Sequence, residues 1–188
     1  MVTDIKNDAD ALIVMVENLL SVTRIQDGSF PLKKREEMLE EVAGDAILTI
    51  RRRFPNNQVE LLLSEDILYL PMEPVLIKQV IVNLLENSIR HSGSPEPIVL
   101  HLFREDDVAA VEVRDRGRGL TPEVLQAVQS GKFLNRDRSG DSTRGMGIGL
   151  SVCQSIVKAH DGTFTAGNNP EGGAFFRFTL PMEVTTNE

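Results

Sequence analysis

Asn83-Leu-Leu-Glu-Asn87-Ser-Ile-Arg-His91 combines two amides with an apolar background and is the most informative segment of this sequence. It belongs to an apolar segment that we predict to be a helix from about Val75 to His91, closed by a Ser-Gly-Ser-Pro turn. Asn83 and Asn87 are four residues apart and therefore share one helix face. Two amides on an apolar helix are costly to bury without partners. They are either surface or satisfied core amides, or neutral oxygen ligands for a hard cation such as Mg²⁺.

Two glycine-containing motifs follow toward the C-terminus. Asp115-Arg-Gly-Arg-Gly119 comes at the end of an apolar strand, where the glycines allow a flat ligand to approach the backbone and Asp115 can accept a hydrogen bond from an amine, although Asp-x-Gly is also a common turn. Gly145-Met-Gly-Ile-Gly-Leu150 opens a predicted helix, so its amides form either a phosphate cradle or a hinge. No strand precedes these glycines and no Lys-Ser/Thr pair follows them, which excludes the dinucleotide and P-loop motifs.

The remaining pattern predicts helices layered on one face of a mixed sheet, in the order β-α-ββ-α-ββ-α-loop-α-ββ. The loop, at 131–144, is polar and longer than is usual inside a compact domain, which is typical of a lid. The predicted strands lie near 30–33, 58–63, 67–70, 98–104, 108–114, 163–166 and 174–180, and the predicted helices at 36–53, 75–91, from 121 onward, and from about 147 to 160.

Paired Asn, Asp-x-Gly-x-Gly, a polar loop and Gly-x-Gly-x-Gly, in this order, resemble the ATP-binding domain of the GHKL superfamily, and within it the sensor histidine kinases of two-component systems. Residues 83–91 are similar to the N box of these kinases, 115–119 to the G1 box and 145–150 to the G2 box. Phe133 stands where they have the F box, in a degenerate form. The resemblance covers about residues 30–182, and further details are similar to the potassium-responsive branch of the family.

The resemblance implies an α+β fold, the α/β sandwich of the Bergerat type, with a mixed, mainly antiparallel sheet and helices on one face. It implies ATP and Mg²⁺ as cofactors, with Asn87 as the magnesium ligand and Asp115 bound to the adenine amino group. Arginines of the lid would reach the γ-phosphate. The residues that the resemblance assigns to the nucleotide site are Asn83, Asn87, Arg90, His91, Asp115, Gly117, Gly119, Arg136, Arg138, Gly145, Met146, Gly147, Gly149 and Leu150.

The N-terminal segment reads as an amphipathic helix over residues 4–27 that Gly28 ends. By the resemblance, residues 1–28 are the end of the dimerisation and phosphoacceptor hairpin, and 29–188 are the catalytic domain. None of the three histidines has the sequence of a phosphoacceptor. We therefore expect a fragment that binds ATP without autophosphorylating. The parent protein is expected to form a homodimer through the hairpin and to pass the phosphate to an Asp of a response regulator.

Composition sets the outer limits on function. A net charge of −8 argues against nucleic acid or an anionic membrane as a partner, because phosphates require clustered Lys and Arg. The single cysteine excludes an internal disulfide. No apolar run approaches the roughly 20 residues that cross a bilayer. These features predict a cytoplasmic domain without membrane contact, whose parent can be anchored in the inner membrane.

Three other classes of protein are alternatives to a histidine kinase. A GHKL enzyme that hydrolyses ATP needs a Glu four residues before the metal-binding Asn, where this chain has Asn83, and Glu86 is turned about 100° away from Asn87 on the helix. A serine kinase of the anti-sigma type uses the same pocket but usually lacks a preceding dimerisation helix. A nucleotide-sensing module without transfer activity stays open from the sequence.

Overall fold

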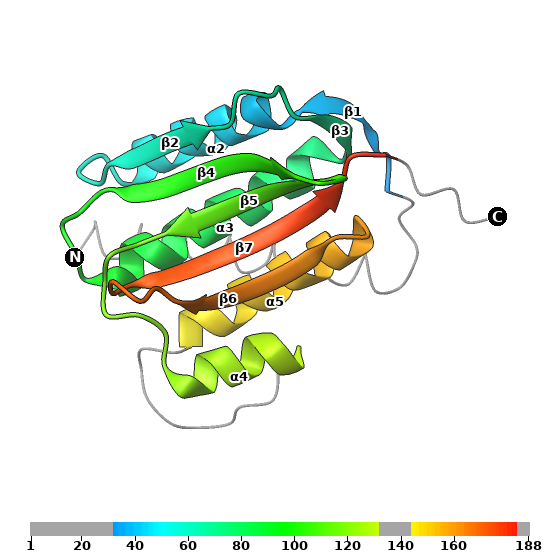
Figure 1. Ribbon diagram of the computed structural model, residues 1–188. Helices are drawn as coiled ribbons and strands as arrows, with labels where there is room; N and C mark the ends of the chain where they lie inside the picture. The colour runs from blue at the N-terminus through cyan, green and yellow to red at the C-terminus, as the bar shows by residue number, and fades with distance from the viewer. Residues whose placement is uncertain (1–31, 132–143, 184–188) are drawn as a thin grey trace, which may run out of the picture.

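The fold is a five-stranded sheet covered on one face by helices, with a separate two-stranded sheet beside it (Figure 1). The computed structural model describes residues 32–131 and 144–183. The five-stranded sheet has the order β2-β4-β5-β7-β6, in which β2 and β4 are parallel and the other neighbours antiparallel. Its strands are β2 (Val59–Leu63), β4 (Ile98–Glu105), β5 (Val108–Arg114), β6 (Thr163–Asn168) and β7 (Ala174–Pro181). This is the mixed, mainly antiparallel sheet that the sequence predicted.

Three helices lie side by side behind the sheet, with α3 between the other two, and α4 lies beyond them near β6 (Figure 1). The helices are α2 (Leu39–Arg53), α3 (Pro74–Ser92), α4 (Pro122–Ser130) and α5 (Arg144–Ala159). Thr121 caps α4 by accepting from the Val124 N–H, and Pro122 occupies its first turn, as expected. The arrangement confirms helices on one face of the sheet.

Buried and more exposed side chains alternate along the strands, and the buried ones form part of the core. In β4 and β7 every second side chain is buried, which is the period of a strand with one face against a hydrophobic layer. The inward side chains include Leu100, Leu102, Phe176 and Phe178, and they meet the apolar face of α3. Because α3 has sheet beneath it and a helix on each side, its apolar residues are buried over most of its circumference.

Some predicted boundaries are wrong, most clearly the start of the first helix of the domain and the strand expected at 67–70, which is observed at Tyr69–Met72. Residues 36–38, expected to begin a helix, belong to β1 (Arg35–Met38), which pairs antiparallel with β3 (Tyr69–Met72) in a separate two-stranded sheet. Helical spacing of apolar residues extends back to Met38, but pairing with β3 holds this segment extended and leaves Met38 as the N-cap of α2. The predicted helix at 4–27 and most of the predicted lid lie outside the described residues.

None of the helices in the described residues is both long enough and apolar enough to cross a lipid bilayer.

Replacing Phe176 tests the core. Phe176→Ala removes a side chain that is 1% exposed, so we expect the free energy of unfolding to fall by about 3–5 kcal/mol. Leu63→Ala is the control, because that side chain is 51% exposed and its loss should cost less than about 0.5 kcal/mol. Urea unfolding followed by circular dichroism measures both. Equal destabilisation by the two variants would contradict the assigned core.

Candidate functional site

Two amides on α3 are buried without partners. Asn83 and Asn87 are 7% and 8% exposed, and the Nδ2 atom of each has no hydrogen-bond partner among the described residues. Buried polar groups are almost always paired, because an unpaired one costs about 1–3 kcal/mol. The two side chains are therefore not at the surface, and their unpaired nitrogens fit the contact with a polar ligand.

The two amides lie where α3 meets α5. The two helices run antiparallel: Cys153 donates to the Val80 carbonyl over 3.8 Å, and a Cβ placed on Gly149 would lie 3.9 Å from Nδ2 of Asn87. The last glycine of the glycine-rich motif thus faces the predicted magnesium ligand. Burial raises the pKa of Cys153 to about 12, so its thiol stays protonated and acts as a packed, weakly donating side chain.

Gly145, Met146 and Gly147 lie within the first turn of α5, which begins at Arg144 rather than at the predicted Gly147. The first four N–H groups of a helix have no partner within it, so the predicted anion cradle keeps its free amides at this helix start. Leu150 is fully buried, so only its backbone faces the cradle. The predicted lid arginines, Arg136 and Arg138, lie outside the described residues.

Asp115 is a buried carboxylate, 5% exposed, at the end of β5. Its Oδ1 accepts from the Gly117 N–H at 2.9 Å and from the Ala174 N–H at 3.2 Å. These two amides fix the plane of the carboxylate, which leaves Oδ2 as the oxygen for a ligand amine. The side chain is thus held in place without any cation.

The loop after Asp115 lies against the C-terminal end of α3. A Cβ on Gly117 would come within 2.3 Å of the Ser92 carbonyl oxygen, so only glycine permits this approach. Arg118 then caps the helix: its backbone N–H donates to the Ser92 carbonyl and its Nε donates to the carbonyl of His91. Helix α3 therefore makes both contacts. Asn87 lies near Gly149, and Ser92 contacts the Asp115 loop.

Sequence reasoning missed the β6–β7 turn, which holds the Asp115 loop. Asn168 accepts from the Leu120 N–H and donates back to its carbonyl, which fixes the backbone next to Gly119. Asn169 donates to the backbone carbonyl of Asp115. A Cβ on Gly173, whose φ is +86°, would lie 2.0 Å from that same carbonyl. The signal was present as Asn-Asn and Gly-Gly in one turn.

His91 and Arg90 follow Asn87 on α3 and have different environments. Burial lowers the pKa of the half-buried His91, and Arg118 and Arg90 lower it further, so the imidazole is neutral near pH 7. Arg90 is exposed and its guanidinium lies 5.2 Å from the centre of the Phe54 ring on the side of α2. A contact between Arg90 and phosphate stays a prediction that requires this side chain to turn.

A metal at this site would rely on amide and phosphate oxygens. The described residues contain no group of three His, Cys, Asp or Glu side chains that could hold a metal ion. Asn oxygens suit Mg²⁺, which takes oxygen ligands, retains several waters and shares phosphate oxygens of its substrate. The residues present therefore fit a cation that arrives with a nucleotide.

Comparison with known proteins settles the family. Residues 72–184 match the model of the histidine kinase-, DNA gyrase B-, and HSP90-like ATPases. The chain belongs to this family. It is 35% identical to the sensor protein KdpD of Clostridium acetobutylicum over 98% of its own length, and 38% identical to KdpD of Escherichia coli over 90%. It spans only 20% and 19% of those two proteins.

Solved structures agree on the fold. The histidine kinase AdeS of Acinetobacter baumannii superposes with a TM-score of 0.74 at 20% identity, covering 96% of this chain and 83% of that one. The catalytic domain of histidine kinase ThkA gives 0.68 at 23% identity, covering 80% and 97%. The α+β fold expected for a GHKL domain is confirmed.

Replacing Gly117 tests the approach between the loop and α3. Gly117→Ala places a methyl group 2.3 Å from a carbonyl oxygen, so we expect a loss of about 1–3 kcal/mol in the free energy of unfolding. Gly44→Ala is the matched control, because nothing lies within 4 Å of that Cβ and Gly44 is inside α2; it should stabilise by roughly 0.5–1 kcal/mol. Thermal unfolding measures both. A Gly117→Ala protein as stable as the Gly44→Ala protein would contradict the geometry.

Proposed function

We propose that this chain is the catalytic domain that binds Mg²⁺ and ATP and transfers the γ-phosphate to a histidine on a dimerisation hairpin. The observation that carries the proposal is the position of Asn83 and Asn87, whose side chains are buried with the Nδ2 atom of each unpaired among the described residues. They lie on a helix that contacts Gly149 and the Asp115 loop. Membership in the ATPase family and the similarity to sensor kinases support it.

The phosphate end of the site is the junction of α3 and α5. An Asn side chain offers an oxygen to a cation and an Nδ2 donor to a phosphate oxygen, so Asn87 can serve both groups at once. The free amides in the first turn of α5, at Gly145, Met146 and Gly147, would hold the phosphate chain. Mg²⁺, when bound, would neutralise phosphate charge and orient the γ-phosphate for transfer.

The adenine end of the site is the Asp115 loop. With Oδ1 held by Gly117 and Ala174, Oδ2 is left to accept from the exocyclic amine of adenine. Guanine has a carbonyl oxygen at that position, which would face the carboxylate and be repelled. Gly117 and Gly119 leave space for the purine beside the backbone. This end sets which nucleotide binds.

Transfer to a protein acceptor fits the site better than hydrolysis does. Glu86, the acidic residue next to Asn87, forms an ion pair with Arg53 of α2 at 2.6 Å, and its side chain is 12% exposed. It therefore points toward α2 and is held there, away from the site of a water that would attack ATP. Phosphoryl transfer depends chiefly on positioning and charge, which this site supplies without a general base of its own.

The parent protein would place this domain beside its acceptor. We assign residues 1–28 to the end of the dimerisation hairpin and 29–188 to the catalytic domain, within a homodimer that passes phosphate to a response regulator. The identities with the two KdpD proteins support the branch of the family expected from the sequence. The nucleotide site would face the cytoplasm, where ATP is.

Nucleotide-dependent stabilisation tests the site. At about 100 times Kd, ATP with Mg²⁺ should stabilise the domain by roughly 2.7 kcal/mol, whereas GTP should stabilise it far less. Asn87→Ala should remove the part of the ATP effect that a chelator removes, and Asp115→Ala should remove the preference for ATP over GTP. Thermal shift titrations measure all of these effects. Equal shifts for ATP and GTP in the unaltered chain would contradict the role of Asp115.

Incubation with labelled ATP tests whether a histidine of this chain accepts phosphate. His160 is buried, and both of its ring nitrogens are hydrogen-bonded. His91 is half-buried, and the ring of His101 stacks on Phe103. We therefore expect no acid-labile phosphohistidine. A separately supplied hairpin that carries an acceptor histidine should become labelled. Acid-stable phosphoserine on a partner protein, with no label on the hairpin, would point to a serine kinase instead.

A further inference from the structure

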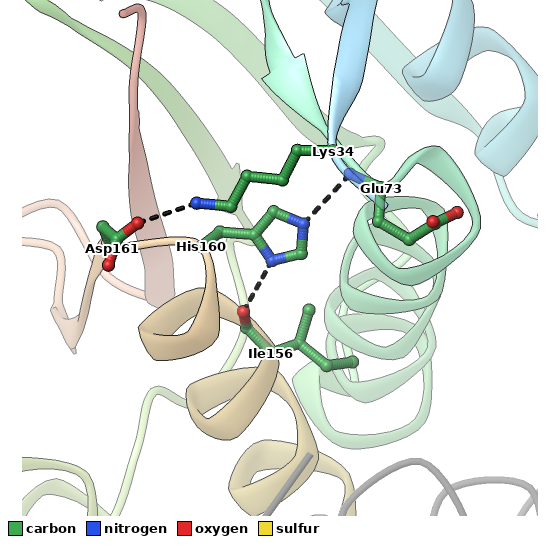
Figure 2. Close-up of polar contacts among 5 residues, drawn as sticks. All are labelled: Lys34, Glu73, Ile156, His160 and Asp161. Carbon is green, nitrogen blue, oxygen red and sulfur yellow. Dashed lines mark hydrogen bonds and ion pairs between the residues drawn. The ribbon is translucent and has the colours of Figure 1, made fainter. Parts of the chain in front are cut away.

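His160 joins the end of α5 to the start of α3 (Figure 2). Its Nε2 accepts from the backbone N–H of Glu73 at 3.1 Å, and its Nδ1 lies 2.8 Å from the Ile156 carbonyl. A backbone N–H can only donate and a carbonyl can only accept, so the proton is on Nδ1 and the ring is neutral. The side chain is 2% exposed, so water cannot replace either contact.

This contact is one end of a line of contacts between α3 and α5. Glu73, Val80 and Asn87 are seven residues apart, so they lie on one face of α3. They meet, in order, His160, Cys153 and Gly149 as α5 runs the opposite way. His160 therefore fixes how far α5 is shifted along α3. Its contact lies about 20 Å from Asn87 at a rise of about 1.5 Å per residue.

We propose that His160 is a positioning residue for the phosphate end of the site, because its neutral imidazole sets the register of α5 along α3 and so the approach of Gly149 to Asn87. The inference rests on the proposed function for its consequence in binding. The adenine end does not depend on this register, since Asp115 is held by β7 and by its own loop. Loss of the contact should therefore weaken binding of the phosphates and spare binding of adenosine.

The turn at the end of α5 holds His160 in place for its contact with Glu73. His160 N–H and Gly162 N–H donate to carbonyls of the last turn, and Asp161 has a φ of +62°. A Cβ on Gly162 would lie 2.0 Å from the Thr179 carbonyl, so the turn fits closely against β7. Lys34 pairs with Asp161 at 2.7 Å across the top of the imidazole (Figure 2). The ring cannot move without the turn that holds it.

Protonation of His160 would break the contact, because Nε2 would become a donor facing the donor of Glu73. Burial lowers the pKa of His160 and Lys34 lowers it further, against the Ile156 carbonyl, Glu73 and Asp161, which raise it. The folded state then binds fewer protons than the unfolded state. The contribution of the neutral His160 to the free energy of unfolding is complete above the ordinary pKa of 6.5. It is lost as the pH falls below that value toward the lowered pKa of the folded state.

Two substitutions of similar size separate the two ring contacts. His160→Gln can place an oxygen near the position of Nε2, accept from Glu73 and never titrate. His160→Asn can reach the Ile156 carbonyl but not Glu73. Lys34→Ala is the control, because it removes the neighbouring ion pair and leaves both imidazole contacts in place.

Binding of ATP with Mg²⁺ and of adenosine is measured by calorimetry on the 188-residue chain. We expect His160→Asn to raise the Kd for ATP with Mg²⁺ about tenfold, as residues that act on a site through packed helices can do, and to leave the Kd for adenosine unchanged. His160→Gln and Lys34→Ala should bind both ligands as the unaltered chain does.

Equal weakening of ATP and adenosine by His160→Asn would overturn the proposal, because His160 would then only stabilise the fold. Identical binding by His160→Asn and His160→Gln would also overturn the proposal. A ligand-free measurement keeps the test independent of the proposed function: the NMR signals of the Gly149 amide and the Asn87 side-chain amide should move in His160→Asn and stay in His160→Gln. An unaltered chain that binds no ATP refutes the proposed function, whereas signals that do not move refute the register.

Discussion

A carboxamide buried without a partner costs about 1–3 kcal/mol, and α3 buries two of them where it packs against α5. The close packing brings Gly149 beside Asn87. The rest of the site is arranged around this junction. A protein that retains such a cost in its folded state gains from it where a ligand supplies the missing partners, and a metal-bound nucleotide supplies both acceptors and a cation.

The C-terminal end of α3 performs the second task, which is to hold the Asp115 loop. Glycine at 117 lets the loop backbone approach the Ser92 carbonyl, and glycine at 173 lets the β6–β7 turn approach the Asp115 carbonyl. Both contacts are between backbones, so they do not depend on flexible side chains. The carboxylate therefore keeps one orientation before any ligand arrives, which reduces the entropic cost of binding.

In the proposed function, two parts of α3 have different roles. One part holds the loop that selects the nucleotide, and the other contributes to binding of the phosphates. Asp115 is fixed by the sheet and by its loop, whereas the phosphate end depends on the relative position of two helices. A small shift of α5 would alter the phosphate end alone. For the proposed phosphoryl transfer, which depends chiefly on positioning and charge, such a shift would alter the rate of transfer.

The sequence by itself determined the order of elements, the three motifs and their assignment to one superfamily, because apolar periodicity and glycine spacing are local properties of a chain. It could not determine the boundary at residues 36–38, since pairing with β3 overrode a helical pattern, nor the role of Asn169 and Gly173, which act on a carbonyl more than 50 residues away. The unpaired Nδ2 atoms of Asn83 and Asn87 and the contact between His160 and Glu73 are properties of the folded chain alone. Burial and hydrogen bonding between distant segments arise only when the helices pack.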